Sequence, residues 1–133
     1  EMGYLLYGND MGEDTTPLEA NADWTVSFQK GPFIGRETLL AQKQAGVARR
    51  FVAFELVEKA VPRHGFRILD PATSQPIGEV TSGNLSPLLQ KGIGLGYVPL
   101  RYVEPGTSIL IEIRSKNVLA QIVKPPFYKK RKA

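Results

Sequence analysis

Few residues of this chain have the types and the spacing that bond-making chemistry requires. His64 is the single histidine and the chain has no cysteine, so no cysteine–histidine pair can supply a nucleophile and its base. No serine lies in a G-x-S-x-G turn. The aspartates Asp10, Asp14, Asp23 and Asp70 are not spaced as an acid and base pair. The sequence therefore predicts no catalytic residue, no metal site and a histidine in a surface loop.

Aromatic side chains near the amino-terminal end have the shape that binding of a flat ring requires. Tyr4, Tyr7 and Trp24 could stack on such a ring or pack in a hydrophobic core. Trp24 alternates with the apolar residues Val26 and Phe28, so we predict that Trp24 is a core residue. The role of Tyr7 stays open between the two alternatives.

Two charged residues have side chains suited to binding a polar or charged ligand. Glu1 precedes an apolar and aromatic run that ends at Gly8, and a carboxylate can accept two parallel hydrogen bonds. Lys30 could attract a carboxylate group. Taken alone, Glu1 is a surface residue and Lys30 a solvated lysine in a turn. Because the first residues carry neither an initiator methionine nor a charged and apolar leader, we expect the chain to begin partway through a domain.

Composition and charge narrow the class of protein. The 133 residues are 42% hydrophobic, enough for one ordinary core. The net charge of +4 arises largely in the tail Lys129-Lys130-Arg131-Lys132, which we expect to be solvated, so no nucleic-acid role is predicted. No apolar run approaches the roughly 20 residues of a membrane span. Without cysteine the chain forms no disulfide bond.

The pattern of elements changes near residue 47. The segment Thr16-Pro17-Leu18-Glu19 has the residues of a capping box, which predicts a short helix over 17–22. Alternation predicts a strand over 24–28. A helix over 36–45 is predicted to end at Gly46. The first part therefore reads as an α+β fragment.

After residue 47 short strands alternate with turns, which predicts a six-stranded antiparallel β-barrel. Pro105 and Gly106 fit the two central positions of a type II turn, and 113–118 fits a tight hairpin. The glycine-rich run 92–96 lacks both the spacing and the following helix of a nucleotide-binding loop. The six predicted strands cover 49–57, 65–69, 77–82, 92–98, 107–114 and 117–123.

Seven features occur in an order and spacing that is similar to a known family. They are E-M-G-Y-L-L-Y-G at 1–8, D-T-T-P-L-E-A at 14–20, Trp24, K-G-P-F-I-G-R-E at 30–37, P-R-H-G at 62–65, G-E-V-T-S-G-N-L-S-P at 78–87 and P-P-F-Y at 125–128. Together they resemble the carboxy-terminal part of the glycine cleavage system T-protein family, the aminomethyltransferases. The resemblance implies that residues 1–47 end a folate-binding domain and that residues 48–133 form a carboxy-terminal β-barrel domain with a basic tail.

The resemblance also implies roles for single residues. Glu1 matches the carboxylate that contacts the pterin ring of tetrahydrofolate, and Tyr7 lies in the same motif. Lys30 or Arg36 would hold the carboxylates of the folate tail. Lys129 would lie near the mouth of the folate site. The segment 78–87 would pack the barrel against the remaining domains, with its serines bonded to backbone groups.

The activity that the resemblance implies is the transfer of a methylene group to tetrahydrofolate, with release of ammonia, from an aminomethyl group on the lipoyl arm of the glycine cleavage H-protein. The family's catalytic aspartate belongs to an amino-terminal part that this chain lacks, so the chain alone is expected to be inactive. That missing part and the H-protein are the expected partners. The alternatives are a folate-binding module of a sarcosine or dimethylglycine dehydrogenase-like enzyme and a non-catalytic interaction barrel. We expect a bacterial cytoplasmic location, or the mitochondrial matrix for a eukaryotic parent.

Overall fold

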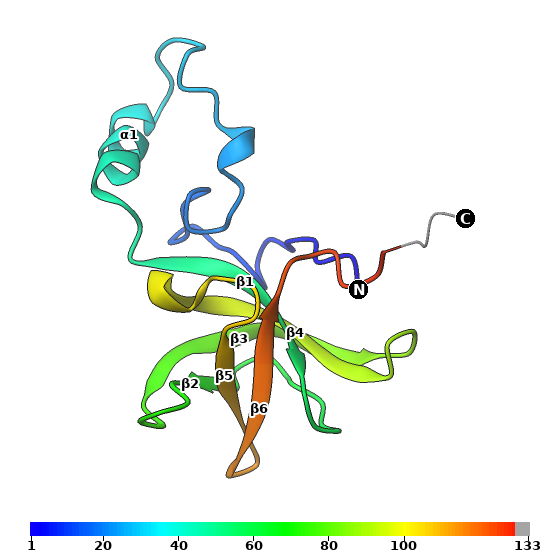
Figure 1. Ribbon diagram of the computed structural model, residues 1–133. Coiled ribbons are helices and arrows are strands. Elements are labelled where there is room, and N and C mark those ends of the chain that lie inside the picture. Colours follow the sequence, from blue (N-terminus) through cyan, green and yellow to red (C-terminus); the bar gives the residue numbers. More distant parts are fainter. Residues whose placement is uncertain (130–133) are drawn as a thin grey trace.

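The computed structural model describes residues 1–129, and Figure 1 shows a barrel with a helix and irregular segments at one end. In chain order the elements are η1 (Asp23–Thr25), α1 (Arg36–Ala45), β1 (Arg49–Leu56), β2 (Arg67–Leu69), β3 (Pro76–Ser86), β4 (Lys91–Pro99), η2 (Leu100–Tyr102), β5 (Ser108–Ile113) and β6 (Lys116–Val123).

The six strands form one closed barrel in the order β1-β4-β3-β2-β5-β6, and every neighbouring pair is antiparallel. This confirms the predicted six-stranded barrel. The predicted turns are also present. Gly106 has a φ of 94°, and the amide of Thr107 donates to the carbonyl of Glu104 over 3.1 Å, as a type II turn requires. Arg114 and Ser115 both have positive φ, which a two-residue type I′ hairpin requires.

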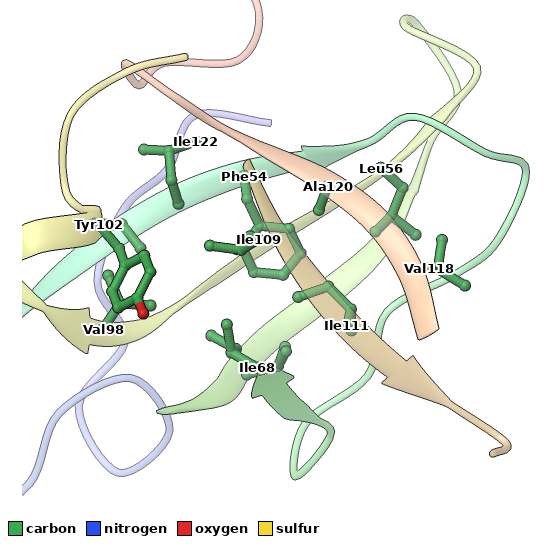
Figure 2. Packing of buried hydrophobic residues seen from close by; sticks show 12 residues of the cluster. Phe54, Leu56, Ile68, Val98, Tyr102, Ile109, Ile111, Val118, Ala120 and Ile122 are labelled. Carbon is green, nitrogen blue, oxygen red and sulfur yellow. The ribbon is translucent and has the colours of Figure 1, made fainter. Parts of the chain in front are cut away.

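The interior of the barrel is filled by alternate residues of its strands. Figure 2 shows Phe54, Ile109 and Ile111 among side chains that point inward from different strands, and all three are fully buried. Tyr102 of η2 packs at one end of the same cluster. Because the side chains of a strand alternate between its two faces, this interior accounts for the period of two in the sequence.

A second cluster covers the outer face of the barrel over β1 and β4. Phe51, Ala53, Leu95 and Tyr97 are buried there, and Leu5 packs against them. We call residues 1–11 the strap, because this segment crosses that outer face. The strap explains why β4 is buried on both faces, although a strand with one solvated face would alternate.

The predicted helix over 17–22 is wrong, although its capping box forms. The amide of Thr16 donates to Glu19 Oε2 over 3.0 Å, and the amide of Glu19 donates to Thr16 Oγ1 over 3.3 Å. Residues 17–21 nevertheless make only a turn. Asn21 has a φ of 58°, a left-handed conformation that ends a right-handed helix. The cap is therefore present without the helix that it would start.

The predicted strand over 24–28 is also wrong, and so is the core position of Trp24. The 3-10 helix η1 occupies Asp23–Thr25, and the side chain of Trp24 is 85% exposed. A closed barrel has no free edge to which a further strand could add. The helix α1 spans Arg36–Ala45 as predicted and is followed by Gly46 with a φ of 85°.

Candidate functional site

The strap is fastened to the barrel by a buried carboxylate. Asp10 is 3% exposed, and its Oδ1 accepts hydrogen bonds from Thr81 Oγ1 (2.6 Å) and Ser82 Oγ (2.5 Å). Its Oδ2 accepts a bond from the amide of Leu6 over 3.0 Å. Burial of a carboxylate is costly unless its oxygens are bonded, and here both are. The Asp10 side chain therefore joins the turn formed by residues 6–10 of the strap to strand β3.

Further bonds surround this carboxylate. Asn9 Nδ2 donates to the carbonyl of Thr81 (3.1 Å) and to Ser82 Oγ (2.7 Å). The hydroxyl of Tyr97, on β4, donates to the carbonyl of Asp10 over 2.9 Å. Burial raises the pKa of Tyr97 to about 12, so the hydroxyl remains a donor at neutral pH. We call Asn9, Asp10, Thr81, Ser82 and Tyr97 the latch.

The other end of the strap is held at the far end of β3. Ser86 is 1% exposed, and its hydroxyl donates to Glu1 Oε1 over 2.5 Å. The amide of Leu88 donates to the same oxygen over 3.4 Å. The hydrogen bond from Ser86 is the main cause that lowers the pKa of Glu1, with a smaller contribution from the Leu88 amide. Glu1 is therefore ionised at neutral pH.

The backbone of Glu1 is bonded to the segment that follows β6. Its carbonyl accepts hydrogen bonds from the amides of Phe127 (3.0 Å) and Tyr128 (3.3 Å). Figure 1 shows this contact where the end marked N lies against the segment after β6. The structure thus brings Glu1 close to the segment that contains Lys129, whose side chain is exposed. Their roles in ligand binding stay predictions.

Two cavities meet at the strap, and a third lies beside the segment that follows β6. One of about 830 Å³ is lined by the strap, by residues 15–25 and by the outer face of the barrel, and it includes the exposed rings of Tyr4, Tyr7 and Trp24. A second, of about 610 Å³, is lined by Glu1 and Ser82 among others. These two share Gly3 and Tyr4, so the aromatic groove and the Glu1 carboxylate lie on neighbouring surfaces. The third, of about 1000 Å³, includes Lys129.

Lys30 lies apart from this group and lines none of the three cavities. Figure 1 shows the loop between η1 and α1 at the tip farthest from the barrel. Arg36, the alternative to Lys30, is engaged locally, because its Nε and Nη2 donate to the carbonyl of Phe28 over 3.2 and 2.9 Å. Of the four predicted binding residues, the structure brings Glu1, Tyr7 and Lys129 to adjoining surfaces and leaves Lys30 outside.

His64 lies in an exposed loop, as predicted. Its Nδ1 is 2.8 Å from the carbonyl of Thr81, which can only accept, so Nδ1 carries the proton. Among residues 1–129 no group of three or more His, Cys, Asp or Glu side chains could hold a metal ion. The helices of this part of the chain include none that is long and apolar enough to cross a membrane.

Sequence reasoning missed the latch. The sequence assigns no role to Asp10, which is not spaced as a member of an acid and base pair, and it predicts that the serines of 78–87 bond backbone groups. Ser86 does accept a bond from the amide of Leu89 over 3.1 Å, but Ser82 bonds the side chains of Asn9 and Asp10. The available signal was the N-D pair after Gly8, a combination typical of turns with side-chain hydrogen bonds.

The closed barrel and the strap across its outer face define a small β-barrel domain that carries an appended segment. Residues 49–129 match the family described as the glycine cleavage T-protein C-terminal barrel domain, and the chain belongs to that family. This confirms the resemblance seen in the sequence.

Individual relatives agree with this assignment. The chain is 52% identical over 130 residues to aminomethyltransferase of Flavobacterium psychrophilum, an alignment that covers 98% of this chain and 36% of that protein. It is 48% identical over 127 residues to aminomethyltransferase of Halothermothrix orenii, with coverages of 96% and 35%. The crystal structure of glycine cleavage system aminomethyltransferase T from Bartonella henselae matches with a TM-score of 0.90 at 32% identity, over 98% of this chain and 37% of that one. The chain thus spans about a third of the length of its relatives.

Proposed function

We propose that this chain is part of a tetrahydrofolate-dependent aminomethyltransferase of the glycine cleavage system and provides one wall of its folate site. The observation that carries the proposal is the Glu1 carboxylate, held by Ser86 beside a groove lined by exposed aromatic rings. Similarity to proteins named aminomethyltransferase over 98% of the chain supports the same activity.

The residues present fit the chemistry of a reduced folate. The pterin ring presents an amino group and a ring N–H side by side, and a carboxylate is their natural acceptor. Within residues 1–129, both hydrogen bonds accepted by the Glu1 side chain fall on Oε1. Oε2 thus remains as an acceptor for a ligand. Tyr7, 63% exposed, offers an aromatic face, and the Lys129 ammonium offers a charge for the carboxylates of the folate tail.

In the proposed reaction tetrahydrofolate accepts the methylene of a lipoyl-bound aminomethyl group, and ammonia is released. This chain binds and orients the folate, whereas bond making belongs to the amino-terminal part of the enzyme. A lipoylated H-protein is the proposed donor of the aminomethyl group and the proposed partner. The proposed location is the bacterial cytoplasm, or the mitochondrial matrix in a eukaryote. The chain alone should show no turnover when it is mixed with lipoylated H-protein and tetrahydrofolate.

The test is a Glu1→Gln substitution in the full-length enzyme. Glutamine keeps the size of the side chain but removes its charge, and its amide N–H₂ would face a pterin donor. An unsatisfied donor weakens binding, so the dissociation constant for tetrahydrofolate should rise roughly 5- to 150-fold by calorimetric titration.

The matched control is Glu13→Gln, which removes the charge of an exposed glutamate elsewhere in the chain. This variant should bind tetrahydrofolate as the wild type does. Equal dissociation constants for the wild type and the Glu1 variant would contradict the proposed role of Glu1.

A further inference from the structure

One strand holds both ends of the strap. Ser86, the last residue of β3, donates to the side chain of Glu1, while Thr81 and Ser82 in the middle of β3 donate to Asp10. Hydroxyl groups of a single barrel strand therefore bind the side chains at both ends of the strap. A bulge in the pairing of β3 with β4 lies between Val80 and Ser82, where a local change of twist can redirect side chains.

Asp10 also organises the strap itself. The amide of Leu6 donates to Asp10 Oδ2 over 3.0 Å, while the amides of Asn9 and Asp10 donate back to the carbonyl of Leu6 over 3.1 and 2.8 Å. The amide of Gly8 donates to the carbonyl of Met11 over 2.8 Å. Tyr7 lies between Leu6 and Gly8, whose backbone groups form these hydrogen bonds. The Asp10 carboxylate thus holds the backbone on both sides of Tyr7, and Glu1 lies at the other end of the same strap.

Asp10 does not need to touch a ligand to matter for binding. Its side chain is almost fully buried, and protein hydroxyl and amide donors bond both of its oxygens. Asp10 nevertheless borders the same 610 Å³ cavity as Glu1, together with Ser82. A displaced latch would therefore shift the wall from which the Glu1 carboxylate projects.

We propose that Asp10 is a positioning residue for folate binding, which acts through the strap on the carboxylate of Glu1. The inference rests on the proposed function. Small errors in the placement of a binding group weaken an interaction strongly, because a hydrogen bond depends on distance and direction. We expect the barrel to stay closed in an Asp10 variant, because Asp10 lies outside the six strands that pair with one another.

The test compares Asp10→Asn with the wild type in the full-length enzyme, with tetrahydrofolate as the probe. An asparagine oxygen can still accept from the Leu6 amide, but its NH₂ group then faces the hydroxyls of Thr81 and Ser82. Both hydroxyls must reverse from donors to acceptors, although the Ser82 hydroxyl already accepts a bond from Asn9. We expect the dissociation constant and the KM for tetrahydrofolate to rise about tenfold, while kcat at saturating folate changes little and the circular dichroism spectrum stays that of the wild type.

A double variant distinguishes positioning from a general loss of structure. If Asp10 acts through Glu1, the Asp10→Asn change should weaken binding about tenfold in the wild type but much less in the Glu1→Gln background. If the two substitutions raise the dissociation constant independently, so that the double variant shows the product of the two single effects, the inference is overturned. A folded Asp10→Asn variant that binds tetrahydrofolate as tightly as the wild type would also overturn it, and in that case the proposed function would stand.

A second pair of variants covers the case in which Asp10→Asn fails to fold. Thr81→Val removes the hydroxyl that donates to Asp10 and nearly keeps the shape, whereas Thr81→Ser keeps the hydroxyl. Weaker folate binding by the valine variant alone supports the inference, and equal binding by both overturns it. If the wild-type enzyme binds no tetrahydrofolate, the proposed function fails and the inference fails with it.

Discussion

The hydroxyl of Ser86 donates to Glu1 Oε1 over 2.5 Å, although 85 positions separate the two residues in the chain. Ser86 is buried at the end of β3 and also accepts a bond from the amide of Leu89, so its hydroxyl is oriented by the barrel. The barrel thereby sets the direction of a carboxylate that is distant in the sequence. A rigid strand is a more accurate support for a binding group than a loop.

A Ser86→Ala substitution should raise the pKa of Glu1. The bond from Ser86 stabilises the ionised carboxylate and is the main cause that lowers this pKa, so its removal should return the pKa toward the ordinary value. Since the pKa is lowered in the folded state, the associated stability is present above the ordinary pKa of glutamate and is lost as pH falls through the folded value. Titration of the Glu1 carboxyl carbon by NMR measures the shift.

The control for this substitution is Ser108→Ala, which removes an exposed serine hydroxyl from β5. The control should leave the Glu1 titration unchanged. The same low pKa in the Ser86→Ala variant would mean that the bond between Ser86 and Glu1 is absent in solution.

The barrel was predictable because its determinants are local. Alternation of apolar residues marks each strand, and the turn at Gly106 and the hairpin at Arg114 and Ser115 require short-range chemistry that the sequence displays. The segment over 17–28 was not predictable in the same way. The capping box of Thr16 and Glu19 and the alternation around Trp24 are real patterns. Asn21, however, adopts a left-handed conformation that ends the helix, and the closed barrel offers no free edge to a further strand.

The latch could not be predicted because its partners are distant in the sequence. Thr81 and Ser82 are 71 and 72 positions from Asp10, and no local pattern relates them. The burial of Phe51 and Ala53 was missed for a similar reason, since the strap that covers them comes from another part of the chain. The alternation of apolar and polar residues indicates which face of a strand is the more apolar. It does not indicate which other segment of the chain covers the opposite face.

Tyr102→Phe should raise the pKa of Asp70. The Tyr102 hydroxyl donates to Asp70 Oδ2, and together with the amides of Thr73 and Ala72 this bond lowers the pKa of Asp70 to about 2. The stability that depends on ionised Asp70 is present above the ordinary pKa of aspartate and is lost as pH falls toward about 2. The Tyr102→Phe variant should therefore lose less stability than the wild type as pH falls from the ordinary pKa of aspartate toward about 2. Thermal unfolding between pH 7 and pH 2 measures the change.

Tyr4→Phe serves as the control, because Tyr4 is exposed on the strap and forms no bond with Asp70. Its pH dependence should match the wild type. If Tyr102→Phe also follows the wild-type curve, the hydroxyl of Tyr102 does not stabilise the Asp70 carboxylate.

Limited proteolysis of the chain should cut first between residues 21 and 46. Figure 1 shows this region projecting from the barrel, and within it η1 and α1 contain no buried residue. Segments with few buried contacts open most easily. The exposed Lys30 is the expected first site for trypsin, and Lys30→Gln should delay the first cut. Mass spectrometry identifies the products. Earlier cleavage within Ile77–Val123 would contradict the prediction.

The glycines of β4 leave room for the barrel interior. A Cβ at Gly94 would overlap the ring of Phe54, which is fully buried. Gly94→Ala should therefore destabilise the chain by about 1–3 kcal/mol, the usual cost of an overpacked core. Replacing Phe54 by leucine removes the ring atoms concerned, so the double variant should be more stable than the sum of the two single changes predicts. Urea denaturation of the wild type, the two single variants and the double variant measures the four free energies of unfolding.

Gly78→Ala is the matched comparison, because the Cβ at that position would meet the backbone carbonyl of Tyr97 instead of a side chain. A backbone atom cannot be made smaller by mutation, and its displacement would disturb the adjacent pairing of Glu79 with Tyr97 between β3 and β4. Phe54→Leu should therefore restore stability to the Gly94 variant and none to the Gly78 variant. Equal rescue of both variants would mean that the leucine acts through general loosening of the core, and that the contact between Gly94 and Phe54 does not limit the packing.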